Sequence, residues 1–172
     1  MLKLVGMICI LAGSTGFGIR MAKELDLRIE ELLNLQHLML SLRGGIRYMH
    51  QPLPEAFSGL AEHAPAPFGA FFLRMAEELK QRQGSTAEEI WNRNLKDCLG
   101  DLHMSGRELE EFRKLGSMLG YLDVEMQVDT LDHYLEQLKL SSAQAMETAK
   151  SRRRMYQYLG ALGGAALVIL IF

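Results

Sequence analysis

The C-terminal stretch from Val124 to Phe172 decides the fold, and it reads VEMQVDTLDHYLEQLKLSSAQAMETAKSRRRMYQYLGALGGAALVILIF. Two sets of mostly apolar residues recur every seven positions in its first part, as on one face of a helix. One set is Val124, Leu131, Leu138 and Ala145, and the other is Val128, Leu135, Ser142 and Ala149. The stretch has no proline, and its first glycine is Gly160. It predicts one long helix, on the order of 70 Å if unbroken.

A second long helix is predicted in the N-terminal part of the chain. Its apolar stripe consists of Leu25, Leu32, Met39 and Ile46, with Ile29, Leu35 and Leu42 beside them. Gly44 and Gly45 weaken this helix, because a glycine in a helix interior costs about 1 kcal/mol relative to alanine. We expect a bend or a close helix contact there. An antiparallel pair of the two long helices is the natural core.

Shorter helices are predicted between the two long ones. Pro52, Pro54, Pro65 and Pro67 separate them, and Pro54 suits the start of a helix that runs to about His63. A further helix begins near Phe68 and ends near Gly84. Thr86 with Glu89 and Ser105 with Glu108 fit two capping boxes, each opening one more helix. The predicted fold class is therefore all-α, a cytosolic six-helix bundle between N- and C-terminal transmembrane helices.

Both ends of the chain carry an apolar segment, Leu4–Ile19 and Leu159–Phe172. Positive charge lies on the inward side of each, where the headgroups of a membrane would attract it. These predicted membrane-surface charges are Arg20, Lys23, Lys150, Arg152, Arg153 and Arg154. The pattern predicts transmembrane helices at 1–20 and 155–172 and a cytosolic bundle at 21–154, with both termini outside the cytoplasm. The alternative for the first segment is a cleaved secretory signal ending near Ala12-Gly13-Ser14.

Small residues in the two apolar segments have a spacing that allows close helix packing in lipid. Ala12 and Gly16 are four residues apart, as are Gly160 and Gly164. Their functional reading is pairing of the two anchors or formation of a homo-oligomer. The alternative is that glycine and alanine are simply frequent in membrane helices.

The charge of the central region excludes one class of function. Residues 24–149 hold 12 basic residues and all 21 acidic ones, a net charge of −9. A general nucleic-acid binder would carry a concentrated basic face, so no nucleic-acid partner is expected. The sequence has no phosphate-binding glycine loop and no paired-histidine motif, so we predict no enzyme activity and no cofactor. Cys98, Asp101 and His103 would suit a metal or nucleophile cluster, but polar residues of a helix connection are the preferred interpretation.

Arg43, Arg47 and Tyr48 lie near the end of the first long helix. An exposed cluster of basic and aromatic side chains there would receive an acidic partner. The alternative is that these residues are ordinary solvated charges.

Several segments together resemble the stage III sporulation protein AB family of endospore-forming bacteria. They are Leu2-Lys3-Leu4-Val5-Gly6, Tyr48 with Pro52-Leu53-Pro54-Glu55-Ala56-Phe57, Leu119-Gly120-Tyr121-Leu122-Asp123 with Glu125 and Gln127, and Tyr158-Leu159-Gly160-Ala161-Leu162-Gly163-Gly164. Their order spans the whole chain. The chain departs from the usual pattern at Arg43-Gly44-Gly45, where polar or acidic helix formers are expected.

The resemblance implies a bundle similar to the inner-membrane platform proteins of type II secretion and type IV pilus systems. It also implies a place in the channel between mother cell and forespore, in the mother-cell membrane. The implied partners are a cytosolic secretion-type ATPase, stage III sporulation protein AA, and other channel components. A membrane-anchored ligand-binding or sensory helical module is the alternative function.

Overall fold

The computed structural model describes residues 2–81, 84–120 and 123–171. Side chains are described for residues 20, 23–81, 84–120, 123–152 and 155. The chain divides into two compact units. One is Glu30–Ser142, and the other consists of the terminal parts Met1–Ile29 and Ala143–Phe172. We describe each unit by itself.

Every regular element in the described residues is an α-helix, which confirms the all-α prediction. The six helices are α1 (Leu2–Met49), α2 (Leu53–His63), α3 (Phe68–Gln81), α4 (Ala87–Leu99), α5 (Gly106–Leu119) and α6 (Val124–Ile171). Four short helices thus lie in sequence between two long ones, as expected. α1 continues through Gly44 and Gly45 to Met49 with no break.

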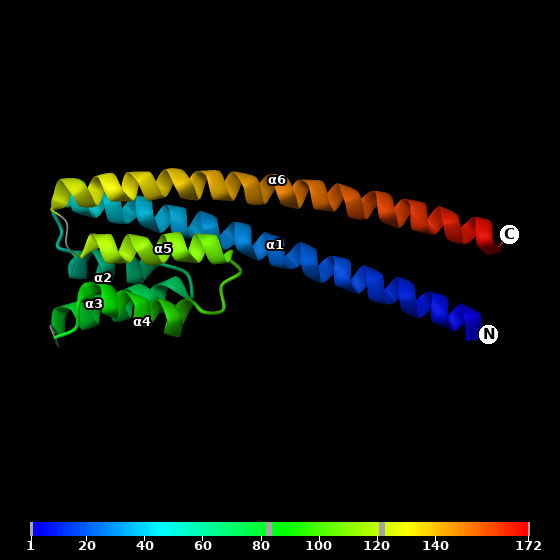
Figure 1. Cartoon of the computed structure of the whole chain (residues 1–172), viewed down its shortest axis with the longest axis horizontal. Coiled ribbons are helices and arrows are strands. Elements are labelled where there is room, and N and C mark those ends of the chain that lie inside the picture. The colour runs from blue at the N-terminus through cyan, green and yellow to red at the C-terminus, as the bar shows by residue number, and fades with distance from the viewer. Residues whose placement is uncertain (1, 82–83, 121–122, 172) are drawn as a thin grey trace. The chain divides into compact units, whose positions relative to one another are not determined.

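Within residues 30–142, the short helices pack in chain order, α2 on α3, α3 on α4 and α4 on α5. Figure 1 shows α5 between two layers, with α1 and α6 on one side of it and α2, α3 and α4 on the other. The Gln127 side chain of α6 donates a hydrogen bond of 2.9 Å to the Leu119 carbonyl at the end of α5. This contact holds the start of α6 against α5.

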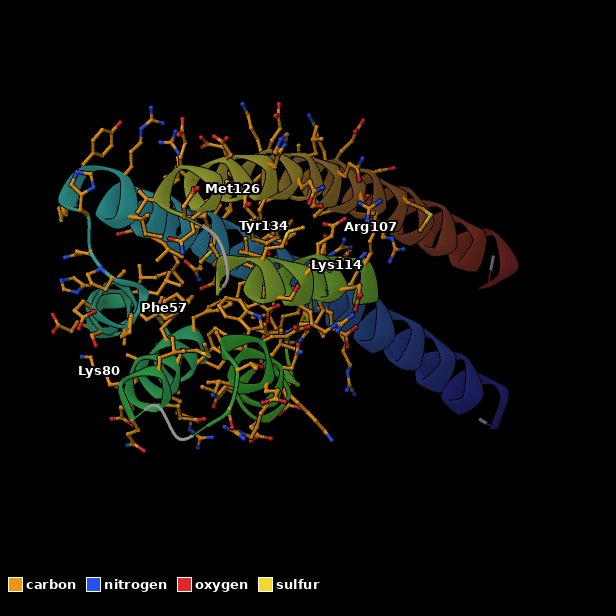
Figure 2. All side chains as sticks on the ribbon, turned by 60° about the vertical axis from the view of Figure 1, so that its left-hand side comes forward. Phe57, Lys80, Arg107, Lys114, Met126 and Tyr134 are labelled. Atoms are coloured by element: carbon orange, nitrogen blue, oxygen red, sulfur yellow. The ribbon has the colours of Figure 1, made fainter. Side chains whose placement is uncertain are left out.

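A chain of aromatic rings crosses this unit from α2 to α6. Phe71 contacts Phe72, Trp91 and Phe112, with ring centroids 5.0, 5.0 and 5.6 Å away. Phe57 extends the chain at one end and Tyr134 at the other, 5.6 Å from Phe72 and 6.1 Å from Phe112. Figure 2 labels these two end members, Phe57 on α2 and Tyr134 on α6. The rings therefore form a core to which five of the helices contribute.

The two long helices also contribute apolar side chains to the core of this unit. The buried hydrophobic side chains of α1 in this unit are Leu32, Leu35, Leu38, Met39, Leu42 and Ile46, and those of α6 are Val128, Leu131, Tyr134 and Leu138. Val124 differs from the heptad prediction, because its side chain is 48% exposed. It is the first residue of α6, so no preceding turn of the helix covers it.

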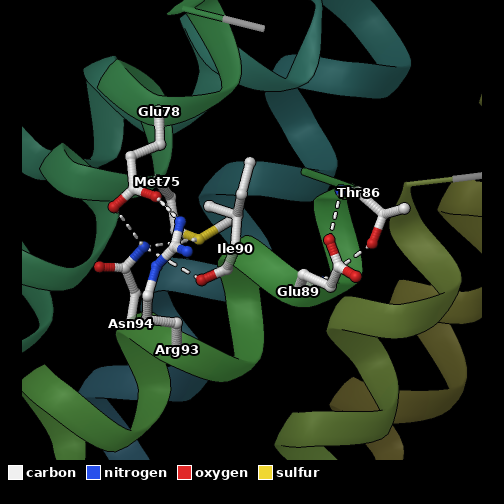
Figure 3. A network of polar contacts seen from close by, with 7 residues as sticks. All are labelled: Met75, Glu78, Thr86, Glu89, Ile90, Arg93 and Asn94. Carbon is white, nitrogen blue, oxygen red and sulfur yellow. Dashed lines mark hydrogen bonds and ion pairs between the residues drawn. The ribbon is translucent and has the colours of Figure 1, made fainter. Parts of the chain in front are cut away.

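The helix boundaries follow the local signals in the sequence. Both predicted capping boxes are present: Thr86 and Glu89 exchange hydrogen bonds at the start of α4, as do Ser105 and Glu108 at the start of α5. Figure 3 shows the first of these pairs. α2 begins one residue earlier than predicted, at Leu53, with Pro52 as its N-cap.

Two glycines in this unit allow close contacts. A Cβ on Gly116 would lie 2.1 Å from the Trp91 ring, so α5 approaches α4 closely at this point. A Cβ on Gly45 would lie 2.8 Å from Oε1 of Gln51, whose backbone N–H donates to the Gly45 carbonyl at 3.2 Å. At Gly44-Gly45 the structure thus shows no close helix contact among the described residues; the close neighbour of Gly45 is Gln51, in the connection that follows α1.

The terminal unit contains the start of α1 and the end of α6. Ala145 and Ala149, two positions of the predicted heptads, are buried. No helix among the residues that the structure describes with side chains is long and apolar enough to cross a membrane. The predicted spans at 1–20 and 155–172 fall almost entirely on residues outside that set, so both stay predictions.

Candidate functional site

The predicted partner-binding residues lie in the last two turns of α1, within the 30–142 unit. Arg43 and Arg47 are four residues apart and so share a side of the helix, one turn from each other. Tyr48 follows directly. The structure gives the two arginines different surroundings.

Arg43 is engaged inside the protein. Its Nη2 donates a hydrogen bond of 2.8 Å to Oδ2 of Asp132 on α6, and its Nε contacts Oδ1 of the same carboxylate. This two-point contact raises the pKa of the Arg43 guanidinium, chiefly through the hydrogen bond to Asp132. The side chain is only 24% exposed. Arg43 thus links the two long helices, which supports their predicted antiparallel pairing.

Arg47 and Tyr48 face solvent. Tyr48 is 73% exposed, and the Arg47 guanidinium carbon lies 5.8 Å from the centre of its ring. Among the described residues, no carboxylate pairs with Arg47. The guanidinium and the ring are thus close enough to attract each other as a cation–π pair. Of the three predicted residues, these two are available for binding.

Cys98, Asp101 and His103 do not form a common site in the described part of the chain. The His103 ring turns to α1, where its Nδ1 lies 2.8 Å from Oε1 of Glu31. The His103 backbone N–H donates to the other oxygen of Glu31 at 2.7 Å. No group of three His, Cys, Asp or Glu that could hold a metal ion is found among the described residues. These contacts fasten the connection between α4 and α5 to α1.

A polar network around the buried Asn94 joins α3 to α4 (Figure 3). Asn94 is 1% exposed, and its Nδ2 donates to Oε1 of Glu78 at 3.1 Å and to the Ile90 carbonyl at 3.0 Å. Arg93 pairs with the same Glu78 carboxylate. Burial raises the pKa of Glu78, but the hydrogen bonds from Arg93 and Asn94 outweigh it and leave the pKa lowered. The network holds α3 and α4 together. It was not predicted from the sequence, because Asn94 belongs to no motif.

The predicted membrane-surface residues are described only in part. Arg20 is exposed and pairs with Glu24 at 3.5 Å, and Lys23 and Lys150 are exposed. Arg152 borders an open hollow of about 520 Å³, whose lining among the described residues is Gln144, Glu147, Thr148, Ser151 and Arg152 of α6. The side chains of Arg153 and Arg154 lie outside the described residues, as do Ala12, Gly16, Gly160 and Gly164. The packing predictions for the anchors therefore stay predictions.

Fold and surface together define an all-α bundle protein with an exposed arginine and tyrosine at the end of α1. Comparison with known proteins gives its family. The model of the family described as "Stage III sporulation protein AB" matches residues 3–172 of the chain. The chain belongs to this family, which places it in a sporulating bacterium.

Two individual proteins are similar to the chain over most of its length. Stage III sporulation protein AB of Bacillus subtilis (strain 168) is 29% identical over 171 residues, which cover 99% of each chain. A solved structure titled "Stage III sporulation protein AB (SpoIIIAB)" superposes with a TM-score of 0.65 at 25% identity. It covers 72% of this chain and 97% of the solved one. The family resemblance inferred from the sequence is confirmed.

Proposed function

We propose that the protein is a non-enzymatic platform component of a secretion-like channel between mother cell and forespore. In this role it lies in the mother-cell membrane and holds a cytosolic secretion-type ATPase, of the stage III sporulation protein AA type, against the other channel proteins. Membership of a sporulation family supports a role in sporulation. The step from that family to a channel platform rests on the resemblance to platform proteins of secretion systems.

One structural observation carries the proposal. The most exposed large apolar side chains of the described residues, Tyr48 and Met49, are 73% and 70% exposed and lie together at the end of α1. The unpaired Arg47 lies beside them. Aromatic residues, methionine and arginine are the types enriched where proteins bind one another. This end of α1 therefore suits contact with a protein.

Binding to the ATPase is tested by co-purification. The full chain and the AA-type ATPase are co-expressed, the membranes are solubilised, and the complex is isolated through a tag on the ATPase. We expect Arg47→Glu to reduce the recovered chain at least about tenfold, because the substitution reverses the exposed cation. Lys80→Glu is the matched control, since Lys80 is exposed on α3 and its ammonium group donates a hydrogen bond to the Ser58 hydroxyl. Equal recovery of the wild-type chain with and without the ATPase would refute the platform role.

Membrane topology is tested separately, by a reporter fused at the exposed Gly100. The proposal requires its signal on the cytoplasmic side. A signal from the outer side would overturn both the cytosolic bundle and its contact with a cytosolic ATPase.

A further inference from the structure

One side of α1 is exposed or half-exposed in the 30–142 unit. Residues that recur at steps of three or four lie on one face of a helix. Leu33, His37, Leu40, Gly44 and Tyr48 share the face opposite the buried stripe of Leu32, Leu35, Met39, Leu42 and Ile46. Leu40 is 46% exposed and Tyr48 is 73% exposed. The open face therefore combines apolar side chains with a glycine at its centre.

Gly44 has no function in the fold of the single chain. An added Cβ would meet nothing within 4 Å, so no neighbouring group excludes a side chain. Gly44 lies inside α1, where glycine weakens a helix and no special backbone conformation is needed. It differs in this from Gly45 and Gly116, whose missing side chains make room for groups of this same chain. Gly44 lowers the stability of the helix without making room for any group of this chain. Its missing side chain would instead let a partner helix approach the backbone of α1 closely.

The charge around this face defines the chemistry of what approaches. Residues 32–54 contain Arg43 and Arg47 and no Asp or Glu, although the region 24–149 carries a net charge of −9. Asp132 neutralises Arg43, so Arg47 remains as the free cation at the edge of the face. Within residues 32–54, the charge of Arg47 therefore favours an acidic partner over a basic one.

We propose that an acidic helix of the partner ATPase crosses α1 at Gly44, between Leu40 and Tyr48, with its carboxylates beside Arg47. This inference rests on the proposed function and locates its contact. A helix pair meets at an axis separation of about 8 Å where small residues lie at the crossing, against about 10 Å where large ones do. Gly44 provides the small residue, and Leu40 and Tyr48 provide the apolar contacts on either side.

The test uses a pair of glycines that are alike in the free protein. Gly59 in α2 also has nothing within 4 Å of an added Cβ. Gly44→Leu and Gly59→Leu are introduced into the full chain in phospholipid nanodiscs, and affinity for the purified AA-type ATPase is measured. We expect Gly44→Leu to weaken binding at least about tenfold and Gly59→Leu to leave it within about twofold. Equal affinities of the two variants overturn the proposal.

Alanine separates binding from folding. Gly44→Ala is expected to raise the melting temperature by roughly 2 to 4 °C, because alanine favours the helix and meets no neighbour. It is nevertheless expected to weaken ATPase binding, which a purely structural role for Gly44 does not predict. Tighter or unchanged binding by this more stable variant contradicts the crossing at Gly44.

Two further readouts identify the occupant. Rising salt should weaken binding by the wild-type chain more than binding by Arg47→Gln, since the contact with Arg47 is between charges. If Gly44→Leu changes the mass of the chain alone by light scattering, the face joins two copies and an ATPase helix is excluded. If the wild-type chain does not bind the ATPase at all, the result contradicts the proposed function itself. Binding that is unaffected by Gly44→Leu overturns only the position of the contact.

Discussion

The hydroxyl of Tyr134 is buried without a hydrogen-bond partner among the described residues. Burial, followed by the charges of Glu111 and Glu108, raises the pKa of this phenol well above its ordinary value of 10.0. The neutral phenol is therefore favoured in the folded chain. In the unfolded chain Tyr134 ionises near its ordinary pKa, so the folded state loses stability as the pH rises above about 10.

Tyr134→Phe is expected to leave the free energy of unfolding unchanged at neutral pH or to raise it by about 1 kcal/mol, because an unsatisfied buried hydroxyl is removed. Above about pH 10 the variant should gain on the wild type, since phenylalanine does not ionise. Urea unfolding followed by the fluorescence of Trp91, the single tryptophan, measures both quantities. A variant that is less stable by several kcal/mol would show that the hydroxyl has a partner.

Gly116→Ala is expected to destabilise the protein by about 1 to 3 kcal/mol, because its Cβ would overlap the Trp91 ring. The matched control is Gly106→Ala, which adds a methyl group at the start of the same helix with nothing within 4 Å. Thermal unfolding of the two variants measures the difference. Similar melting temperatures would mean that α4 and α5 can separate without cost.

At the scale of the helix, the two capping boxes fix where α4 and α5 begin. In each, the Ser or Thr hydroxyl accepts from a backbone N–H, and the Glu side chain accepts from the N-cap N–H. Thr86→Ala and Ser105→Ala should each cost about 1 kcal/mol of stability. Ser85→Ala, one residue before the first cap and exposed, should cost almost nothing. A capping contribution is ruled out if all three variants melt together.

The helices were predictable from sequence because their signals are local. Prolines, capping boxes and apolar periodicity act over a few residues, and they placed the starts of α2 to α6 to within about one position. The contact of Arg43 with Asp132 was not predictable, because 89 positions separate the two residues. The sequence alone does not say which of the many acidic residues pairs with Arg43. One of the three predicted partner-binding residues, Arg43, is therefore already paired within the chain. His103 was likewise visible as a polar residue, but its contact with Glu31 required the fold.

On the scale of the whole molecule, the aromatic core makes the 30–142 unit depend on a few rings. Phe112 is fully buried and contacts Phe71, Trp91 and Tyr134, which come from α3, α4 and α6. Phe112→Ala is expected to lower the free energy of unfolding by about 3 to 5 kcal/mol. Leu73→Ala, at a side chain 49% exposed, should lower it by less than about 1 kcal/mol. Urea unfolding followed by Trp91 fluorescence compares them, and a small effect at Phe112 would mean that the rings do not form one core.

The capping box at Ser105 has a consequence for how the length of the chain can vary. Because Ser105 and Glu108 set the first turn of α5, a residue inserted after Asp101 would lengthen only the connection that precedes it. A residue inserted after Glu110 would instead turn Phe112 and Leu115 by about 100° away from the core. Natural homologues are therefore expected to gain or lose residues between α4 and α5 and to keep a constant count from Ser105 to Leu119.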